Sequence, residues 1–355
     1  MQIAKRPYIV VDVGGTIINR SRPGTVQRVV DCLKSLGINV SSQAHRLAVA
    51  SIVLTSPDPE SAAGALVEFL RLPQAFGEII HASLIEPDGD AFLFDHALDL
   101  LSAARSYGWG VVAATNAVRW ITPLPLEISD RCDSIVSSGD LGIIKQDLRF
   151  WSALRERVGL DPAFTLVVGD EPDADVISAR RGAYAALKVD HREVTLSMIR
   201  SAIEQAGPMP SDADGIAAGV EYRWAGRWVI DVPNLIILLT RVTRARVEIQ
   251  TTAGTRFGEV VRRRDDSPVL VAAEGRKDLP SISWVRVRAD RRMAVIPQDL
   301  ALALADAGVS ISALTIGEQR LMIGMVREAR EPLVRKRRIA DIVEHLKPRS
   351  QQYDT

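Results

Sequence analysis

The chain has 355 residues, and its 44 Lys and Arg balance its 44 Asp and Glu. A chain of this length exceeds one average domain, so we expect at least two. The only cysteines, Cys32 and Cys132, are too few for a disulfide framework or a thiolate metal site, which favours a reducing compartment and a cytoplasmic protein. No apolar segment is long enough to span a bilayer, which argues against a membrane protein.

The zero net charge hides two oppositely charged parts. From Gly219 onward there are 24 Lys and Arg against 17 Asp and Glu, a net charge of +7, which leaves −7 for the residues before it. Segment 206–218 is rich in turn formers and is the expected linker. Exposed charge pairs are weak and screened by salt, so charge alone predicts loose docking, whereas the apolar run 235–239 could form a firm interface.

The first predicted strand delivers Asp12 into the glycine turn Gly14-Gly15-Thr16. In open α/β sheets, ligands bind beyond the carboxyl ends of the strands, and glycines let backbone N–H groups approach an anion. The segment 18–86 that follows has the composition of helices, with a helix start at Pro57-Asp58-Pro59. The turn therefore predicts a phosphate site.

Polar side chains follow the later apolar strands in the same way. A strand over 109–114 ends at Thr115 and Asn116, a loop ahead of the next helix carries Lys145, and a strand over 165–169 ends at Asp170, with Asp175 shortly after. Strand ends in this β-α order predict a parallel sheet that gathers these side chains along one edge.

These motifs, in their order and spacing, resemble those of the haloacid dehalogenase superfamily over residues 8–205. The matches are Asp-x-x-Gly-Thr at 12–16, Thr115, Lys145 and Gly-Asp-x-x-x-x-Asp at 169–175. The resemblance implies a Rossmann-like parallel sheet in residues 1–205 with a helical cap inserted at about 18–86. In that cap His45, Arg46 and His81 are candidate substrate contacts.

The resemblance also implies a phosphohydrolase of small phosphorylated metabolites that works through an aspartyl-phosphate. In it Asp12 attacks phosphorus, Thr115 holds the phosphoryl oxygens and Lys145 neutralises the developing charge. A carboxylate that attacks a phosphoryl dianion needs cations to cancel the repulsion, and Mg²⁺ prefers oxygen ligands. The implied Mg²⁺ ligands are Asp12, the carbonyl of Gly14, Asp170 and Asp175, and the implied substrate contacts are Gly15, Thr16 and Asn116.

Gly14 departs from the family pattern. The family's phosphatases usually have a second aspartate there, which protonates the leaving oxygen and then activates water. Loss of a positioned acid commonly costs about 10²–10⁴-fold for a poor leaving group. Acyl phosphates, activated esters and carbon–phosphorus bonds therefore become more plausible substrates than alkyl esters, and a catalytically impaired pseudoenzyme that binds a ligand or a protein is an alternative.

Three further alternatives depend on single features. Phosphonoacetaldehyde hydrolases also have a small residue at position 14 but need a cap lysine, and Lys34, the one lysine between 17 and 91, lies in a predicted amphipathic helix. Dehalogenases have little use for the Asp170 and Asp175 box. Actin-like sugar kinases share the first loop but leave Lys145 unexplained.

The C-terminal part reads as two units. Short strands predict a small β-barrel in 219–290, and a helical tail follows in 291–348. The expected strands are 220–232, 246–252, 259–263, 269–273 and 283–288, and the expected helices are 297–304 and 316–346. This part weakly resembles the YdeI/OmpD-associated family, through the 295–300 and 327–339 segments, which leaves a protein partner open. The basic run 335–338 has no interleaved aromatics, so a solvated helix face is favoured over nucleic-acid binding.

Because every matched motif precedes the linker, the sequence predicts that residues 1–205 fold and bind ligand by themselves.

Overall fold

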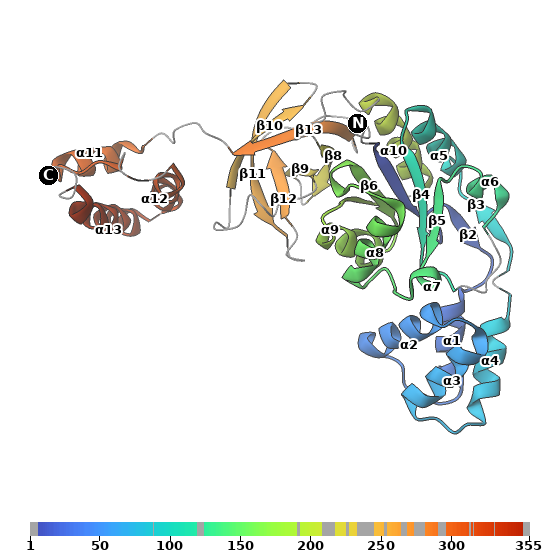
Figure 1. The fold of residues 1–355 in the computed structure, drawn as a ribbon. Helices are drawn as coiled ribbons and strands as arrows, with labels where there is room; N and C mark the ends of the chain where they lie inside the picture. The colour runs from blue at the N-terminus through green and yellow to red at the C-terminus, as the bar shows by residue number, and fades with distance from the viewer. Residues whose placement is uncertain are drawn as a thin grey trace. The chain divides into compact units, whose positions relative to one another are not determined.

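The computed structural model describes residues 6–87, 89–118, 124–189, 192–207, 217–224, 227–232, 245–251, 254–263, 268–272, 281–289, 296–311, 314, 316–329 and 331–350. Residues 1–289 and 290–355 form two compact units (Figure 1). Most of the expected linker, and the apolar run 235–239, lie outside the described residues.

A five-stranded parallel sheet, in the order β5-β4-β1-β6-β7, forms the centre of the first unit. Its strands are β1 (Tyr8–Asp12), β4 (Gly110–Thr115), β5 (Ser134–Ser137), β6 (Thr165–Gly169) and β7 (Ala185–Lys188). The three central strands are almost continuous runs of buried residues, as expected where helices cover both faces of a sheet. This confirms the predicted α/β core.

Alternate residues of the strands face two separate apolar clusters. Ile9 and Val11 pack with α5 (Ala97–Ser106) and α10 (Arg192–Ala206) on one face. Val10 packs on the other face, where the helices are α8 (Leu148–Val158) and α9 (Ser178–Arg181). Shorter elements complete the core: α6 (Leu126–Ser129), α7 (Ser138–Leu141), the 3₁₀ helix η1 (Pro162–Phe164) and the π-helix η2 (Pro172–Ile177).

A helical insertion, residues 25–85, follows β1. It leaves and rejoins the core through the antiparallel pair β2 (Ile18–Arg20) and β3 (Ala91–Leu93) (Figure 1). Its four helices bury an apolar cluster that also includes Val118 and Ile144 of the core. The helices are α1 (Thr25–Ser35), α2 (Gln43–Thr55), α3 (Pro59–Leu70) and α4 (Phe76–Ile85). The Asp58 side chain caps α3 by accepting from the Ser61 N–H, as the sequence predicts for this start.

The predicted barrel is a closed antiparallel barrel of six strands in the order β10-β11-β12-β9-β8-β13. Its strands are β8 (Ala217–Trp224), β9 (Arg227–Asp231), β10 (Ala245–Thr251), β11 (Gly254–Arg262), β12 (Pro268–Ala272) and β13 (Ser281–Ala289). The expected run 220–232 is a hairpin, because Trp224 pairs with Arg227 and two residues between them are the length of a tight hairpin loop.

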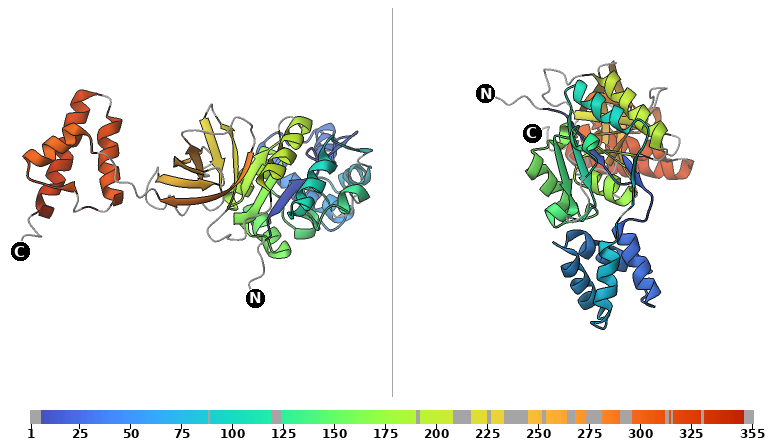
Figure 2. Two further views of the ribbon diagram at one scale, coloured as in Figure 1. Left: turned by 90° about the horizontal axis from the view of Figure 1, so that it is seen from above. Right: turned by 90° about the vertical axis from the view of Figure 1, so that its right-hand side faces the viewer.

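The barrel packs against the α/β core (Figures 1 and 2). Ala218, Val220, Ile282 and Trp284 belong to the same apolar cluster as Ile9 and helices α5 and α10. The sequence did not predict this shared core.

The second unit has three helices among its described residues: α11 (Gln298–Asp306), α12 (Ile316–Glu328) and α13 (Pro332–Ser350). The expected helix 316–346 is two helices, because Pro332 lacks an N–H and disfavours helical geometry at the residue before it. The helices enclose a small apolar cluster that includes Leu300, Ile323 and Leu346. No helix in the described parts of the chain combines the length and apolar character needed to cross a membrane.

Candidate active site

Asp12 lies at the carboxyl end of β1, the central strand of the sheet. The turn after it is closed by hydrogen bonds from the Ile17 and Ile18 N–H groups to the Val13 carbonyl. Gly15 has a positive φ of 87°, and a Cβ on it would lie 2.5 Å from Asp170 Oδ2. Glycine is therefore required at position 15 both by the backbone and by the close approach of the aspartate.

Lys145 joins two carboxylates at the centre of the site. Its Nζ donates to Asp12 Oδ1 in a short contact, to Asp175 Oδ1 at 2.5 Å and to the Ala114 carbonyl at 3.3 Å. The three charged side chains are buried, with 7% of Asp12 and 2% each of Lys145 and Asp175 exposed. A buried ammonium between two carboxylates is the arrangement expected of a group that balances negative charge.

Burial controls the titration of this pair. Burial raises the pKa of Asp12 to about 7, although the neighbouring Lys145 ammonium acts to lower it. Burial alone lowers the pKa of Lys145, but the carboxylates of Asp12 and Asp175 outweigh it and raise that pKa above its ordinary value. Lys145 is therefore a permanent cation, while Asp12 in the metal-free protein exchanges its proton near neutral pH.

Three carboxylates converge beside Lys145. One oxygen each of Asp12, Asp170 and Asp175 lie within 4.8 Å of one another. Thr16 Oγ1 donates to Asp170 Oδ1 at 3.2 Å, and the Glu171 N–H donates to Asp175 Oδ2 at 3.0 Å. Hard oxygen donors held this closely by neighbouring groups fit a divalent cation such as Mg²⁺.

A chain of amide side chains connects the other motifs. Asn116 Oδ1 accepts from the Lys145 N–H, and its Nδ2 donates to Gln146 Oε1, both at 3.0 Å. Gln146 Nε2 in turn donates to Glu171 Oε1 at 3.3 Å. The end of β4, the lysine loop and the metal loop are thus fastened to one another.

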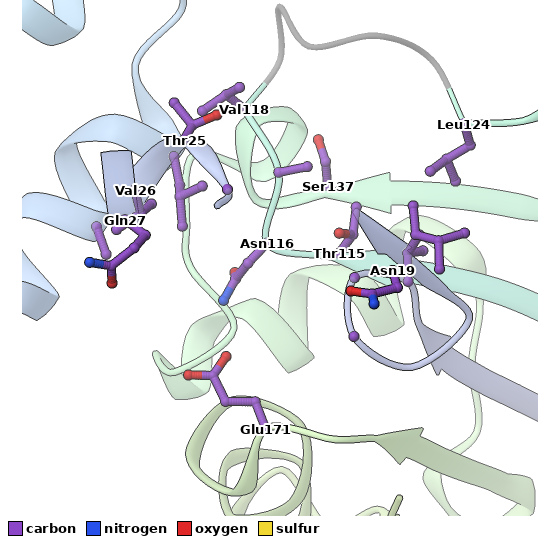
Figure 3. Close-up of a pocket in the computed structure, with 18 of the residues that line it drawn as sticks. Asn19, Thr25, Val26, Gln27, Thr115, Asn116, Val118, Leu124, Ser137 and Glu171 are labelled. Atoms are coloured by element: carbon purple, nitrogen blue, oxygen red, sulfur yellow. The ribbon is translucent and has the colours of Figure 1, made fainter. Parts of the chain in front are cut away.

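A cavity of about 680 Å³ lies between the core and the helical insertion; the turn that follows Asp12 lines it, whereas Asp12, Lys145, Asp170 and Asp175 do not. Gly14, Gly15, Thr115 and Asn116 line it from the core, and the N-terminal turn of α1 lines it from the insertion (Figure 3). The Glu171 carboxylate points into it toward Asn116 (Figure 3). The cavity is large enough for a small metabolite.

A family model for haloacid dehalogenase-like hydrolases matches residues 6–182. This part of the chain belongs to that family. Similar solved structures include a HAD phosphatase from Thermococcus onnurineus, with 18% identity, a TM-score of 0.31 and coverage of 52% of this chain and 86% of that one. A 2-haloacid dehalogenase from Pseudomonas syringae pv. Tomato DC3000 has 14% identity and a TM-score of 0.35, with coverage of 52% and 86%. A HAD family enzyme from Bacteroides thetaiotaomicron, in complex with magnesium and inorganic phosphate, has 16% identity and a TM-score of 0.35, with coverage of 52% and 94%. No match was found among curated proteins.

The structure brings together the side chains that the haloacid dehalogenase-like motifs singled out, but not the other candidates. His45, Arg46 and His81 do not line the described cavity. Lys34 is about half exposed and pairs with Asp31 at 3.0 Å on the surface of α1, as the amphipathic pattern predicts.

Sequence reasoning missed two members of the site, Gln146 and Glu171. Both line the cavity, and each directly follows a residue of a recognised motif, Lys145 or Asp170. Their place next to those motifs is the signal that could have revealed them.

Proposed function

We propose that the haloacid dehalogenase-like part of this protein is a Mg²⁺-dependent phosphohydrolase that forms an aspartyl-phosphate on Asp12. The observation that carries this proposal is the buried Lys145 joined to Asp12 and Asp175, with Asp170 completing a cluster of three carboxylates. A structural ion pair needs no third carboxylate, and it needs no cavity lined by the turn next to one of its members. The arrangement instead supplies a nucleophile with the cations it needs.

The residues have distinct roles in the proposed reaction. A carboxylate oxygen of Asp12 attacks phosphorus, the bond from phosphorus to the leaving group breaks, and the leaving group takes the electron pair. Water then attacks the phosphorus of the aspartyl-phosphate, which releases phosphate and restores Asp12. Lys145 favours the ionised form of Asp12 and offsets its charge, while Thr115, buried at the end of β4, contacts the phosphoryl oxygens.

Asp12, Asp170, Asp175 and the Gly14 carbonyl would hold the metal. When bound, Mg²⁺ supplies positive charge to the phosphoryl oxygens and to the attacking carboxylate. Thr16 and Gly15 contribute by fixing Asp170, through the Thr16 hydroxyl and through the room that only glycine leaves. The roles of these residues follow from their positions around Asp12.

The helical insertion acts as a cap in this proposal. Thr25 and Gln27 at the start of α1 line the cavity (Figure 3), and so does Leu54 of α2. A substrate in the cavity therefore contacts the insertion with the part that leaves, so the insertion selects among small phosphorylated molecules.

Gly14 favours leaving groups that depart without a proton, such as those of acyl phosphates. Phosphonate cleavage through a Schiff base lacks support, because no lysine among the described residues lines the cavity. The competing proposal that Gly14 specifically favours is a pseudoenzyme, which keeps ligand binding without turnover.

Binding of a phosphate mimic tests the site without a known substrate. Beryllium fluoride with Mg²⁺ should raise the melting temperature of the whole chain, and Asp12→Asn and Asp170→Asn should each abolish the rise. Asp147→Asn is a matched control, because Asp147 caps α8 and pairs with Arg149 outside the carboxylate cluster. Equal stabilisation of wild type and both site variants would exclude the assignment, and binding without release of phosphate from any acyl phosphate would favour the pseudoenzyme.

A further inference from the structure

The contact between barrel and core has an apolar part and a polar part. In the apolar part, the rings of Trp109 and Trp284 lie 5.5 Å apart, and both side chains are buried. An interface that shares one apolar cluster holds the barrel at a fixed place on the core. A charged group that crosses this interface therefore meets its partner in a constant geometry.

The polar part centres on Arg180 of α9. Arg180 Nε donates to Asp231 Oδ2 of β9 at 2.5 Å, and its Nη2 donates to the Tyr222 hydroxyl of β8 at 2.8 Å. The same Nη2 donates to the Ala186 carbonyl of β7 at 2.9 Å. Asp231 is 2% exposed and also accepts from Arg263 at 3.2 Å, so two guanidinium groups depend on one buried carboxylate.

Arg180 also belongs to the segment that carries Asp175. The π-helix η2, which contains Asp175, continues without a break into α9, which contains Arg180. At the start of this segment, Gly169 leaves no room for a Cβ against the Asp175 side chain. Between the two, Ser178 accepts from Trp151 Nε1 at 2.7 Å. The segment from Asp175 to Arg180 is therefore held against the core at one end and against the barrel at the other.

We propose that Asp231 is a positioning residue, which acts through Arg180 to hold η2 and α9 so that Asp175 faces Asp12 and Asp170. The barrel is then part of the metal-binding architecture. This inference rests on the proposed function, because it assigns Asp175 to a metal site. π-Helices are rare and often occur at functional sites, and Arg180 connects the helix that follows this one to β7 and to the barrel.

Loss of the Asp231 charge should loosen this segment in a specific way. Without the Asp231 charge, Arg180 and Arg263 both lose an ion pair to the same carboxylate, and repulsion between two buried cations favours local movement. Movement of α9 is transmitted to Asp175, since only four residues separate Asp175 from Arg180 in one helical segment. Substitution of a group that supports a metal ligand typically lowers metal affinity by roughly 10–100-fold. Asp231 acts on Asp175 only through Arg180, one contact further away, so we expect a loss of about 10-fold.

The experiment compares Asp231→Asn with Glu221→Gln in the full chain. Glu221 is a matched control, because it is equally buried in the same barrel and pairs with Arg256, at 3.2 Å, rather than with the core. The Mg²⁺ concentration at half-saturation is measured by titration calorimetry, and hydrogen exchange is followed at the amides of residues 172–181. Asp231→Asn should raise the half-saturation concentration about 10-fold and speed exchange in this segment, whereas Glu221→Gln should change neither.

Tyr222→Phe keeps the test decisive if Asp231→Asn does not fold, because it removes no charge. It removes the hydrogen bonds that the Tyr222 hydroxyl accepts from Arg180 and from Arg263. It should shift both readouts in the same direction by a smaller factor. Wild-type Mg²⁺ binding and exchange in a folded Asp231→Asn or Tyr222→Phe variant would overturn the proposal, as would equal shifts in Glu221→Gln. If wild type binds no Mg²⁺ while exchange in 172–181 still rises in Asp231→Asn, the proposed function fails and the positioning role stands.

Discussion

Gly14→Asp restores the acid/base aspartate that the family's phosphatases usually carry, and the structure has room for it. A Cβ on Gly14 meets no atom within 4 Å, and Gly14 lines the cavity. Its φ is outside the left-handed region, so an aspartate there causes no backbone strain. We therefore expect the variant to fold and to direct a carboxyl group toward the leaving group.

The size of the gain depends on the leaving group. A positioned general acid commonly contributes about 10²–10⁴-fold, which corresponds to roughly 2.7–5.4 kcal/mol of the barrier. An alkyl oxygen leaves as a strong base and should gain the whole amount. A carboxylate leaving from an acyl phosphate needs no proton, so its release should gain little.

The assay measures kcat/KM of wild type, Gly14→Asp and Gly14→Ala with an alkyl phosphate and with acetyl phosphate. Wild type should prefer acetyl phosphate, and Gly14→Asp should narrow that preference by at least about 10²-fold. Gly14→Ala adds the Cβ without the carboxyl and should behave as wild type. Comparable wild-type rates with both substrates would refute the reasoning, as would an equal gain in Gly14→Ala.

Two further predictions concern the metal and the barrel. Because burial raises the pKa of Asp12 to about 7, a proton competes with Mg²⁺ at this carboxylate. The Mg²⁺ concentration at half-saturation should therefore rise about tenfold per pH unit below pH 7 and level off above it. A half-saturation concentration that calorimetry finds unchanged from about pH 5.5 to about pH 8.5 would contradict this prediction. A chain that ends at Gln205 lacks Val220, Ile282 and Trp284, each of which is buried against the core. Because a fully buried large apolar side chain contributes about 1.5–3 kcal/mol, this truncated chain should aggregate or melt far below the whole protein. A soluble truncated chain with wild-type Mg²⁺ binding would show instead that residues 1–205 are an independent module.

The clustering of these candidate side chains could be predicted, because each of them belongs to a short local motif. Asp12, Thr115 and Asp170 lie at or directly after the ends of apolar strands, and parallel strands collect their carboxyl ends along one edge of the sheet; Lys145 lies on the loop ahead of α8. The contact of Lys145 with both Asp12 and Asp175 was not readable from spacing, because it depends on how far one long side chain reaches across the sheet.

The predicted bounds of strands and helices were wrong where a single pair of residues or a single proline determines them. The strands β8 and β9 were read as one run because only two residues separate their β-forming stretches, and the pairing of Trp224 with Arg227 is not visible in the composition. The break before α13 could have been predicted, since Pro332 is visible in the sequence. Barrel closure could not, because it depends on pairing between β10 and β13, which are far apart in the chain.

The interface between core and barrel shows why net charge was a poor guide to how these parts meet. The part of the chain with net charge −7 contributes an arginine, Arg180, and the part with net charge +7 contributes an aspartate, Asp231. Each member of this ion pair therefore has a charge opposite to the net charge of its own part of the chain. Net charge acts through solvent, where salt screens it within about 8–10 Å, whereas the side chains of this pair are only 11% and 3% exposed. Desolvation strengthens a well-matched pair and penalises an unmatched one, so specific burial, rather than the sum of surface charges, determines which faces join.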